Sequence, residues 1–130
     1  LQQAFNNLLQ NAVKYSYRTA GHSDPRFISV RGRPMNDGYE VAVSNFGVGI
    51  ERDEYNKIFE EGYKGKLTRA EYRTGSGQGL ALTKRVIENH NGMITLHSEP
   101  KGEPDGDGAR PYVTRFAVWL PLKQAKSGVL

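Results

Sequence analysis

The sequence predicts an α+β domain, a two-layer α/β sandwich in which helices cover one face of a mixed β-sheet. Two observations support this class. Residues 1–16 and the segment after residue 79 have helical spacing, whereas apolar residues alternate in two strand-like segments over 27–44, and a second pair of strands is predicted after residue 92. Helices and strands are thus grouped along the chain, unlike the strict strand–helix alternation of a doubly wound parallel sheet.

Composition describes one ordinary globular domain. The chain has 130 residues, 37% of them hydrophobic and 25% charged, and no apolar run approaches the length of a membrane span. The absence of cysteine excludes disulfides and thiolate metal sites. A formal net charge of +4 suits an anionic ligand, but the basic residues are scattered, which argues against a nucleic-acid interface.

The first helix is predicted over residues 1–16. One apolar stripe at helical spacing contains Leu1, Phe5, Leu8 and Ala12. Asn7, Asn11 and Lys14 stand at i, i+4 and i+7 and therefore share a neighbouring stripe, with Tyr15 beside Asn11. The first helix thus presents one apolar and one polar face.

Two strands are predicted next, over residues 27–33 and 39–44, joined by a turn that contains Asn36-Asp37-Gly38. Alternation points five of their side chains inward, namely Ile28, Val30, Tyr39, Val41 and Val43. A short helix is expected to follow Ile50, through Tyr55 and Lys57.

The segment 62–77 has no sustained period and carries several basic residues, and loops of this length are commonly functional lids. A second helix is predicted from Gly79 to about His90, with Asn91-Gly92 as its stop. Strands are predicted over residues 93–98 and 112–120, separated by a surface loop over 101–111 that is rich in Gly, Pro and Asp.

Three further segments carry polar or glycine-rich motifs. Asn45-Phe-Gly-Val-Gly-Ile50 follows a strand, and its glycines permit a tight turn and the close approach of a flat base. Ile58-Phe-Glu-Glu-Gly-Tyr-Lys64 precedes the lid. Gly75-Ser-Gly-Gln-Gly-Leu80 ends the lid and opens a helix, where bare amides and the helix dipole favour phosphate. A Rossmann motif is excluded because no strand leads into Gly75, and a Walker loop because no GK[ST] follows.

Each motif alone has an ordinary structural explanation, such as a solvated helix face or a turn. In this order, however, they resemble the ATP-binding catalytic domain of sensor histidine kinases, within the GHKL ATPase superfamily. The resemblance runs from Leu1 to about Leu122 and leaves residues 123–130 as a C-terminal tail. It also marks the chain as a fragment, because family members have strands and a phosphoacceptor domain upstream.

The resemblance implies a function for the whole assembly. The domain would bind ATP and Mg²⁺ and transfer the γ-phosphoryl group to a histidine on a separate helical dimerisation domain, with a response regulator downstream. A cytoplasmic location is expected, whether or not the parent protein is membrane-anchored, and no membrane or nucleic-acid contact is expected of the domain itself. An acidic residue directly follows the histidine at a kinase phosphoacceptor, but Ser, Asn and Ser follow histidines 22, 90 and 97.

The resemblance also assigns roles to individual residues. Asn11 becomes the Mg²⁺ ligand, supported by Asn7; Lys14 approaches the phosphates, and Tyr15 offers its ring to adenine. The remaining nucleotide contacts fall on Asn45, Gly47, Gly49, Ile50, Phe59, Lys64, Gly75, Ser76, Gly77, Gly79 and Leu80. Phe59 would pack beneath the lid. Lys64 would reach the phosphates or the helical partner domain, unless it is a plain surface charge.

Two positions sharpen the hypothesis: Asn7 distinguishes branches of the superfamily, and Asn45 departs from the family pattern. Hydrolysing members of the superfamily place Glu where Asn7 stands, and an amide cannot act as a base near neutral pH, so Asn7 favours a kinase. Asn45 replaces the family's Asp, whose carboxylate accepts a hydrogen bond from the adenine amino group. Binding is expected to survive, and Asn45→Asp is expected to raise the preference for ATP over GTP.

Two alternatives stay open at this point. One is a nucleotide-binding regulatory domain with degenerate catalysis, which the change at Asn45 makes conceivable. The other is a serine kinase of the anti-sigma type with the same fold. A histidine followed by an acidic residue and a proline in the upstream sequence would distinguish the histidine kinase from both.

Overall fold

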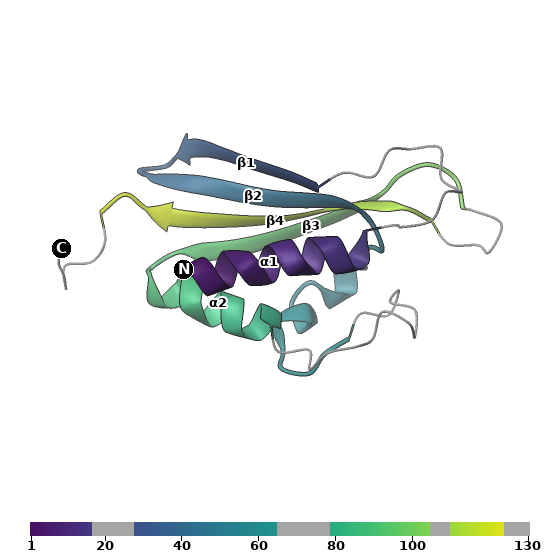
Figure 1. Ribbon diagram of the computed structural model, residues 1–130, viewed down its shortest axis with the longest axis horizontal. Coiled ribbons are helices and arrows are strands. Elements are labelled where there is room, and N and C mark those ends of the chain that lie inside the picture. The colour runs from purple at the N-terminus through teal and green to yellow at the C-terminus, as the bar shows by residue number, and fades with distance from the viewer. Residues whose placement is uncertain (17–27, 65–78, 105–109, 124–130) are drawn as a thin grey trace.

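The computed structural model describes residues 1–16, 28–64, 79–104 and 110–123. Its elements, in chain order, are α1 (Gln2–Tyr15), β1 (Ile28–Met35), β2 (Gly38–Gly47), the 3₁₀ turns η1 (Arg52–Glu54) and η2 (Lys57–Phe59), α2 (Gly79–Asn89), β3 (Met93–Pro100) and β4 (Tyr112–Pro121). Helices α1 and α2 lie against one face of a single sheet (Figure 1). The predicted two-layer α+β class is confirmed.

The sheet has four described strands in the order β1-β2-β4-β3. Every neighbouring pair is antiparallel, so the parallel pair that a mixed sheet requires does not occur in this part of the chain. The connections explain the difference. A two-residue hairpin joins β1 to β2, whereas parallel neighbours need a crossover of a dozen or more residues.

Helix α1 buries an apolar stripe that differs from the predicted one at its start. Ala4, Leu8 and Ala12 are buried in the core, and Phe5 packs partly against it. Leu1 was expected in this stripe but is 43% exposed, because it precedes the first helical turn. The stripe therefore begins with Ala4, one turn before Leu8 on the same face.

Strand β1 has more exposed side chains than the alternation predicted. Ile28 and Val30 share the helix side of the sheet with Val43, yet Val30 is 56% exposed and Ile28 is 41% exposed. The reason is coverage: α1 packs over β2 and α2 packs over β3. Tyr39, at the start of β2, is likewise exposed, so only Val43 of the predicted inward set belongs to the core cluster.

Local turn signals in the sequence are confirmed. Asn36 and Asp37 both have positive φ, as a two-residue hairpin loop of the primed type requires. Asn91 has φ of 62°, and the Gly92 N–H donates to the Ile87 carbonyl, which ends α2. By contrast, the single short helix expected after Ile50 is divided into the two 3₁₀ turns η1 and η2.

The face of the sheet opposite the helices carries a three-strand ion-pair cluster. Glu40 on β2 is buried, and its Oε1 accepts hydrogen bonds from Arg33 Nε on β1 at 3.1 Å and Arg115 on β4 at 2.7 Å. One carboxylate thus connects three neighbouring strands.

No helix among residues 1–16, 28–64, 79–104 and 110–123 is long and apolar enough to cross a membrane. Most of the predicted lid, from residue 65 onward, and the centre of the 101–111 loop lie outside the described residues.

Candidate functional site

Helix α1 connects three of the four motif segments. At its C-terminal end, the Val48 N–H donates to the Tyr15 carbonyl at 2.9 Å, and Ser16 forms an isolated bridge with Gly47. Two to three turns nearer the start of α1, Asn7 Nδ2 donates to the carbonyl of Gly79, the first residue of α2, at 3.3 Å. The asparagine helix, the 45–50 turn and the start of α2 therefore form one contiguous region.

The two glycines of the 45–50 segment are required by protein neighbours. A Cβ on Gly47 would lie 2.0 Å from the Tyr15 carbonyl oxygen, and a Cβ on Gly49 would lie 2.0 Å from the ring of Tyr112. The sequence interpretation attributed both glycines to a tight turn and a flat base. In the structure, the space that a side chain at Gly47 would need is filled by the end of α1, and the space that a side chain at Gly49 would need is filled by the Tyr112 ring.

The helix side of the sheet ends in a row of polar residues. Asn45 on β2 lies opposite Thr114 on β4, and Thr114 lies opposite Ser98 on β3. The preceding row on the same side is apolar and includes Val43 and Phe116 of the core. All three polar side chains are buried, so this row extends the core but carries hydrogen-bonding groups.

Ser98 connects the row to the 45–50 segment. Its Oγ accepts the Ile50 N–H at 3.0 Å and lies 2.7 Å from the Thr114 hydroxyl. The Tyr55 hydroxyl accepts the Ser98 N–H and donates to the Ser98 carbonyl. Ser98 therefore holds the end of the glycine turn and the position of the Thr114 side-chain oxygen.

Asn45 is the exception in this satisfied network. It is 5% exposed, and its Nδ2 has no hydrogen-bond partner among the residues that the structure describes. Buried polar atoms are nearly always paired in folded proteins, and an unpaired one calls for an explanation. A ligand atom that accepts from this amide would provide one.

Sequence reasoning identified Asn45 but missed its neighbours Ser98 and Thr114. The alternation of apolar residues could have indicated them. Ser98 and Thr114 lie on the buried side of β3 and β4, where the neighbouring residues, such as Leu96 and Phe116, are apolar. A hydroxyl in a buried apolar register needs a partner. That Ser98, Thr114 and Asn45 lie side by side follows only from the order and register of β3, β4 and β2.

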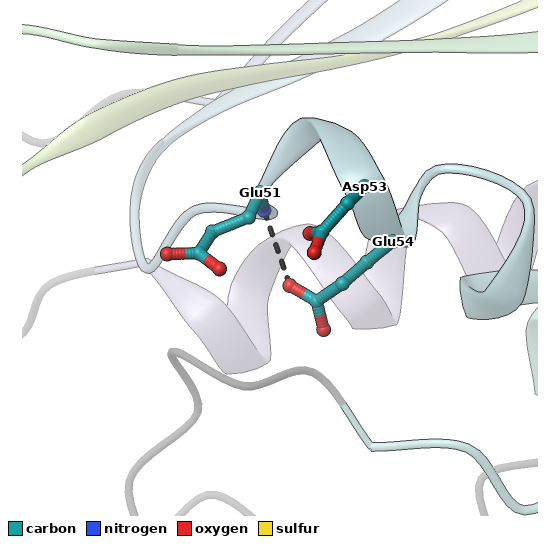
Figure 2. A group of neighbouring side chains, drawn as sticks. All are labelled: Glu51, Asp53 and Glu54. Atoms are coloured by element: carbon teal, nitrogen blue, oxygen red, sulfur yellow. Dashed lines mark hydrogen bonds between the residues drawn. The ribbon is translucent and has the colours of Figure 1, made fainter.

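Another feature that the sequence did not reveal is a cluster of three carboxylates in and beside η1, drawn in Figure 2. Single ligand oxygens of Glu51, Asp53 and Glu54 lie within 4.8 Å of one another. Glu54 is fully buried and both of its oxygens are used: one accepts the Glu51 N–H at 3.2 Å, the dashed line in Figure 2, and the other accepts the Tyr63 hydroxyl at 2.7 Å. Glu54 therefore completes a capping box that shapes the turn after the glycine segment.

The remaining predicted site residues are placed as follows. Asn11 is half-buried on α1, and the Lys14 ammonium lies 5.1 Å from the centre of the Tyr15 ring. Phe59 packs edge-on against Phe116 with 6.2 Å between ring centres. Lys64, near the start of the predicted lid, and Leu80, in the first turn of α2, are both half-buried. Gly75, Ser76 and Gly77 lie outside the described residues.

The comparison with protein families decides what this region belongs to. Residues 1–124 match the family described as histidine kinase-, DNA gyrase B- and HSP90-like ATPases. The chain belongs to this ATPase family. ATP binding is therefore the chemistry that the family supports for this domain.

Relatives of this ATPase domain carry the names of signalling kinases. The sensor-like histidine kinase SenX3 of Mycobacterium tuberculosis strain H37Rv is 35% identical over 100 residues, which cover 77% of this chain and 23% of the relative. The signal transduction histidine-protein kinase/phosphatase MprB of Mycobacterium avium strain 104 is 37% identical over 123 residues, or 93% of this chain and 21% of the relative. The chain spans about a quarter of the length of such relatives.

Solved structures agree with the family. The structure titled mycobacterial sensor histidine kinase MprB superposes with a TM-score of 0.67 at 25% identity, covering 92% of this chain and 71% of that one. Full-length ShkA in complex with AMPPNP superposes with a TM-score of 0.65 at 19% identity, covering 95% of this chain and 22% of that one, which supports the fold. The ATPase domain is thus of the kind found in sensor histidine kinases.

The hydroxyl of Ser98 is expected to stabilise the ATPase domain. Ser98→Ala removes the acceptor of the Ile50 N–H and the partner of the Thr114 hydroxyl, and leaving buried groups unpaired should lower the free energy of unfolding by about 1–3 kcal/mol. Urea denaturation measures this change. Ser44→Ala, half-buried on the opposite face of β2, is the matched control and should change stability by less than about 0.5 kcal/mol. Equal losses in both variants would show that the Ser98 network contributes nothing.

Proposed function

We propose that this domain binds Mg-ATP and transfers the γ-phosphoryl group to a histidine on a separate helical dimerisation domain, in a two-component pathway with a downstream response regulator. The observation that carries the proposal is the buried amide of Asn45, which lacks a partner among the described residues and lies beside the glycine turn where α1 ends. A purine base held there supplies the missing partner, and family membership supports ATP as its source.

The adenine would lie at the polar row, with the Asn45 oxygen accepting from its amino group and the unpaired Nδ2 donating to its ring N1. Thr114, hydrogen-bonded to Ser98, adds a hydroxyl to the same row. From there the phosphates extend along α1 toward the start of α2, where Asn7 holds the Gly79 carbonyl. The helix N-terminus presents amides and a partial positive charge to an anion. The 65–78 segment, which connects Lys64 to Gly79, would complete the phosphate contacts through Gly75, Ser76 and Gly77.

The polar stripe of α1 fits a magnesium ion. Mg²⁺ prefers oxygen ligands and keeps several waters and phosphate oxygens in its shell, so few protein ligands suffice. The amide oxygen of Asn11 would hold the ion. The Asn7 nitrogen is hydrogen-bonded to the Gly79 carbonyl, so its amide oxygen would be left to contact the ion directly or through a water. When bound, the ion neutralises charge on the phosphates.

The remaining catalytic contribution is positioning. Phosphoryl transfer depends chiefly on alignment and charge stabilisation, which Lys14 and the lid amides would add. Asn7 supports transfer over hydrolysis, since an amide does not deprotonate water. The hydrogen bond from Asn7 Nδ2 to the Gly79 carbonyl also favours an amide at position 7, because a carboxylate there has no proton to donate to that carbonyl. A cytoplasmic location follows from the same proposal, because ATP is there.

The isolated domain is expected to bind Mg-ATP and to remain unlabelled when incubated with γ-labelled ATP. The physical reason is the lack of a suitable acceptor among the described histidines. Nδ1 of His90 lies within hydrogen-bond distance of the Val86 carbonyl, at 2.9 Å, and His97 is followed by Ser98 instead of an acidic residue. Calorimetric titration measures binding, and gel autoradiography after alkaline treatment measures phosphohistidine. A stable phosphohistidine on this chain, or no binding of Mg-ATP, would contradict the proposal.

A further inference from the structure

The unpaired amide of Asn45 carries information about which base fits the site. The side chain is 5% exposed, and its nitrogen is without an acceptor among the described residues. A carboxylate in this place would offer acceptors only. The amide offers one acceptor and two donors, and a half-turn about its last side-chain bond exchanges the positions of the two ends. The site can therefore present either a donor or an acceptor to the same ligand atom.

The neighbour of Asn45 is equally adaptable. Thr114 lies opposite Asn45 in the strand register, and its hydroxyl forms a 2.7 Å hydrogen bond with Ser98 in which either oxygen can donate. Each hydroxyl has one donor and two acceptor positions. Because the Ser98 Oγ already accepts from the Ile50 N–H, it can donate its own proton to Thr114 and leave the Thr114 proton available. Neither residue of the row is committed to one hydrogen-bond polarity.

We propose that the site accepts 6-oxopurine nucleoside triphosphates as well as ATP, with Asn45 as the specificity-determining residue. The inference rests on the proposed binding of a nucleotide at this row. Adenine presents a donor at C6 and an acceptor at N1, whereas hypoxanthine and guanine present an acceptor at C6 and a donor at N1. An amide matches the first edge in one orientation and the second edge after a half-turn. An aspartate oxygen that faces the C6 substituent accepts from the adenine amino group but repels the 6-oxygen of hypoxanthine or guanine.

Inosine triphosphate is the sharpest probe, because hypoxanthine differs from adenine only at the edge that Asn45 would contact and lacks the extra 2-amino group of guanine. Both nucleotides are competed, with Mg²⁺ present, against a fluorescent ATP analogue on the intact domain. The wild-type domain is expected to bind the two within about 10-fold of each other, since the cost of a mismatched buried polar contact is avoided. Asn45→Asp is expected to weaken inosine triphosphate relative to ATP by more than about 10-fold.

The matched control is Asn89→Asp, which makes the same change of charge at an exposed position near the end of α2 and should leave the ratio of affinities unchanged. If Asn45→Asp does not fold, the ratio of the wild-type affinities for ATP and inosine triphosphate still tests the inference. Rejection of inosine triphosphate by the wild type by more than about 100-fold, or an unchanged ratio in a folded Asn45→Asp, overturns this inference while ATP binding stands. Binding of neither nucleotide by the wild type overturns the proposed function together with it.

Discussion

Gly47→Ala is expected to lower the free energy of unfolding by at least about 3 kcal/mol, because the added methyl meets a backbone atom that cannot rotate away. The ideal Cβ would lie 2.0 Å from the Tyr15 carbonyl oxygen and 2.8 Å from Ser16 Cα. Relief requires the end of α1 to move away from β2, which breaks the Val48 to Tyr15 hydrogen bond. Thermal denaturation should show a melting temperature lower by about 10 °C.

The control for Gly47→Ala is Gly79→Ala. Its Cβ would meet only the Asn7 side chain, at 3.8 Å, which is ordinary contact. Alanine also favours a helix by about 1 kcal/mol over glycine, so Gly79→Ala should be as stable as the wild type or more stable. A normal melting temperature for Gly47→Ala would mean that α1 and β2 are not packed this closely.

Asn11→Ala is expected to weaken the binding of Mg-ATP by about 100-fold, the upper range for losing a group that supports a bound metal. Its proposed role is to hold Mg²⁺ through the amide oxygen. Stability should be retained, because the core contacts of α1 are made by Ala4, Leu8 and Ala12. Titration of ATP with and without Mg²⁺ measures the effect: the gain in affinity that Mg²⁺ confers on the wild type should disappear in the variant.

Asn6→Ala is the matched control for Asn11→Ala, since Asn6 is an exposed asparagine on the same helix. It should bind Mg-ATP normally. The proposal for Asn11 fails if its variant melts at a much lower temperature while the folded fraction still binds Mg-ATP like the wild type. Asn11 would then be a structural residue.

The features that sequence predicted well are determined locally. Asn91-Gly92 ends α2 because the positive φ and the closing hydrogen bond involve only adjacent residues. The Asn36-Asp37 turn is predicted for the same reason. The class of fold also follows from patterns within each element. Burial of Ile28 and Val30 was predicted wrongly, because it depends on how far the helices extend across the sheet, which no local pattern records.

In the candidate site, too, locally determined features could be predicted from the sequence, whereas features that depend on strand pairing could not. Its asparagine helix and glycine segment stand out in the sequence, but Ser98 and Thr114 join them only through the register of β3, β4 and β2. The reason for Gly49 was likewise hidden, because the ring that needs the space belongs to Tyr112, far along the chain. Glu54 escaped notice because its N-cap partner is Glu51 rather than the usual serine, threonine, aspartate or asparagine.

The Glu40 cluster affects how the strands find their alignment during folding. A slip of one residue between strands sends every side chain to the opposite face of the sheet. For β2, such a slip would carry the Glu40 carboxylate to the helix side, away from Arg33 and Arg115, and leave a charge among apolar side chains. An unpaired buried charge is far more costly than a lost apolar contact. Glu40 therefore penalises misaligned β-sheets more strongly than it stabilises the correct one.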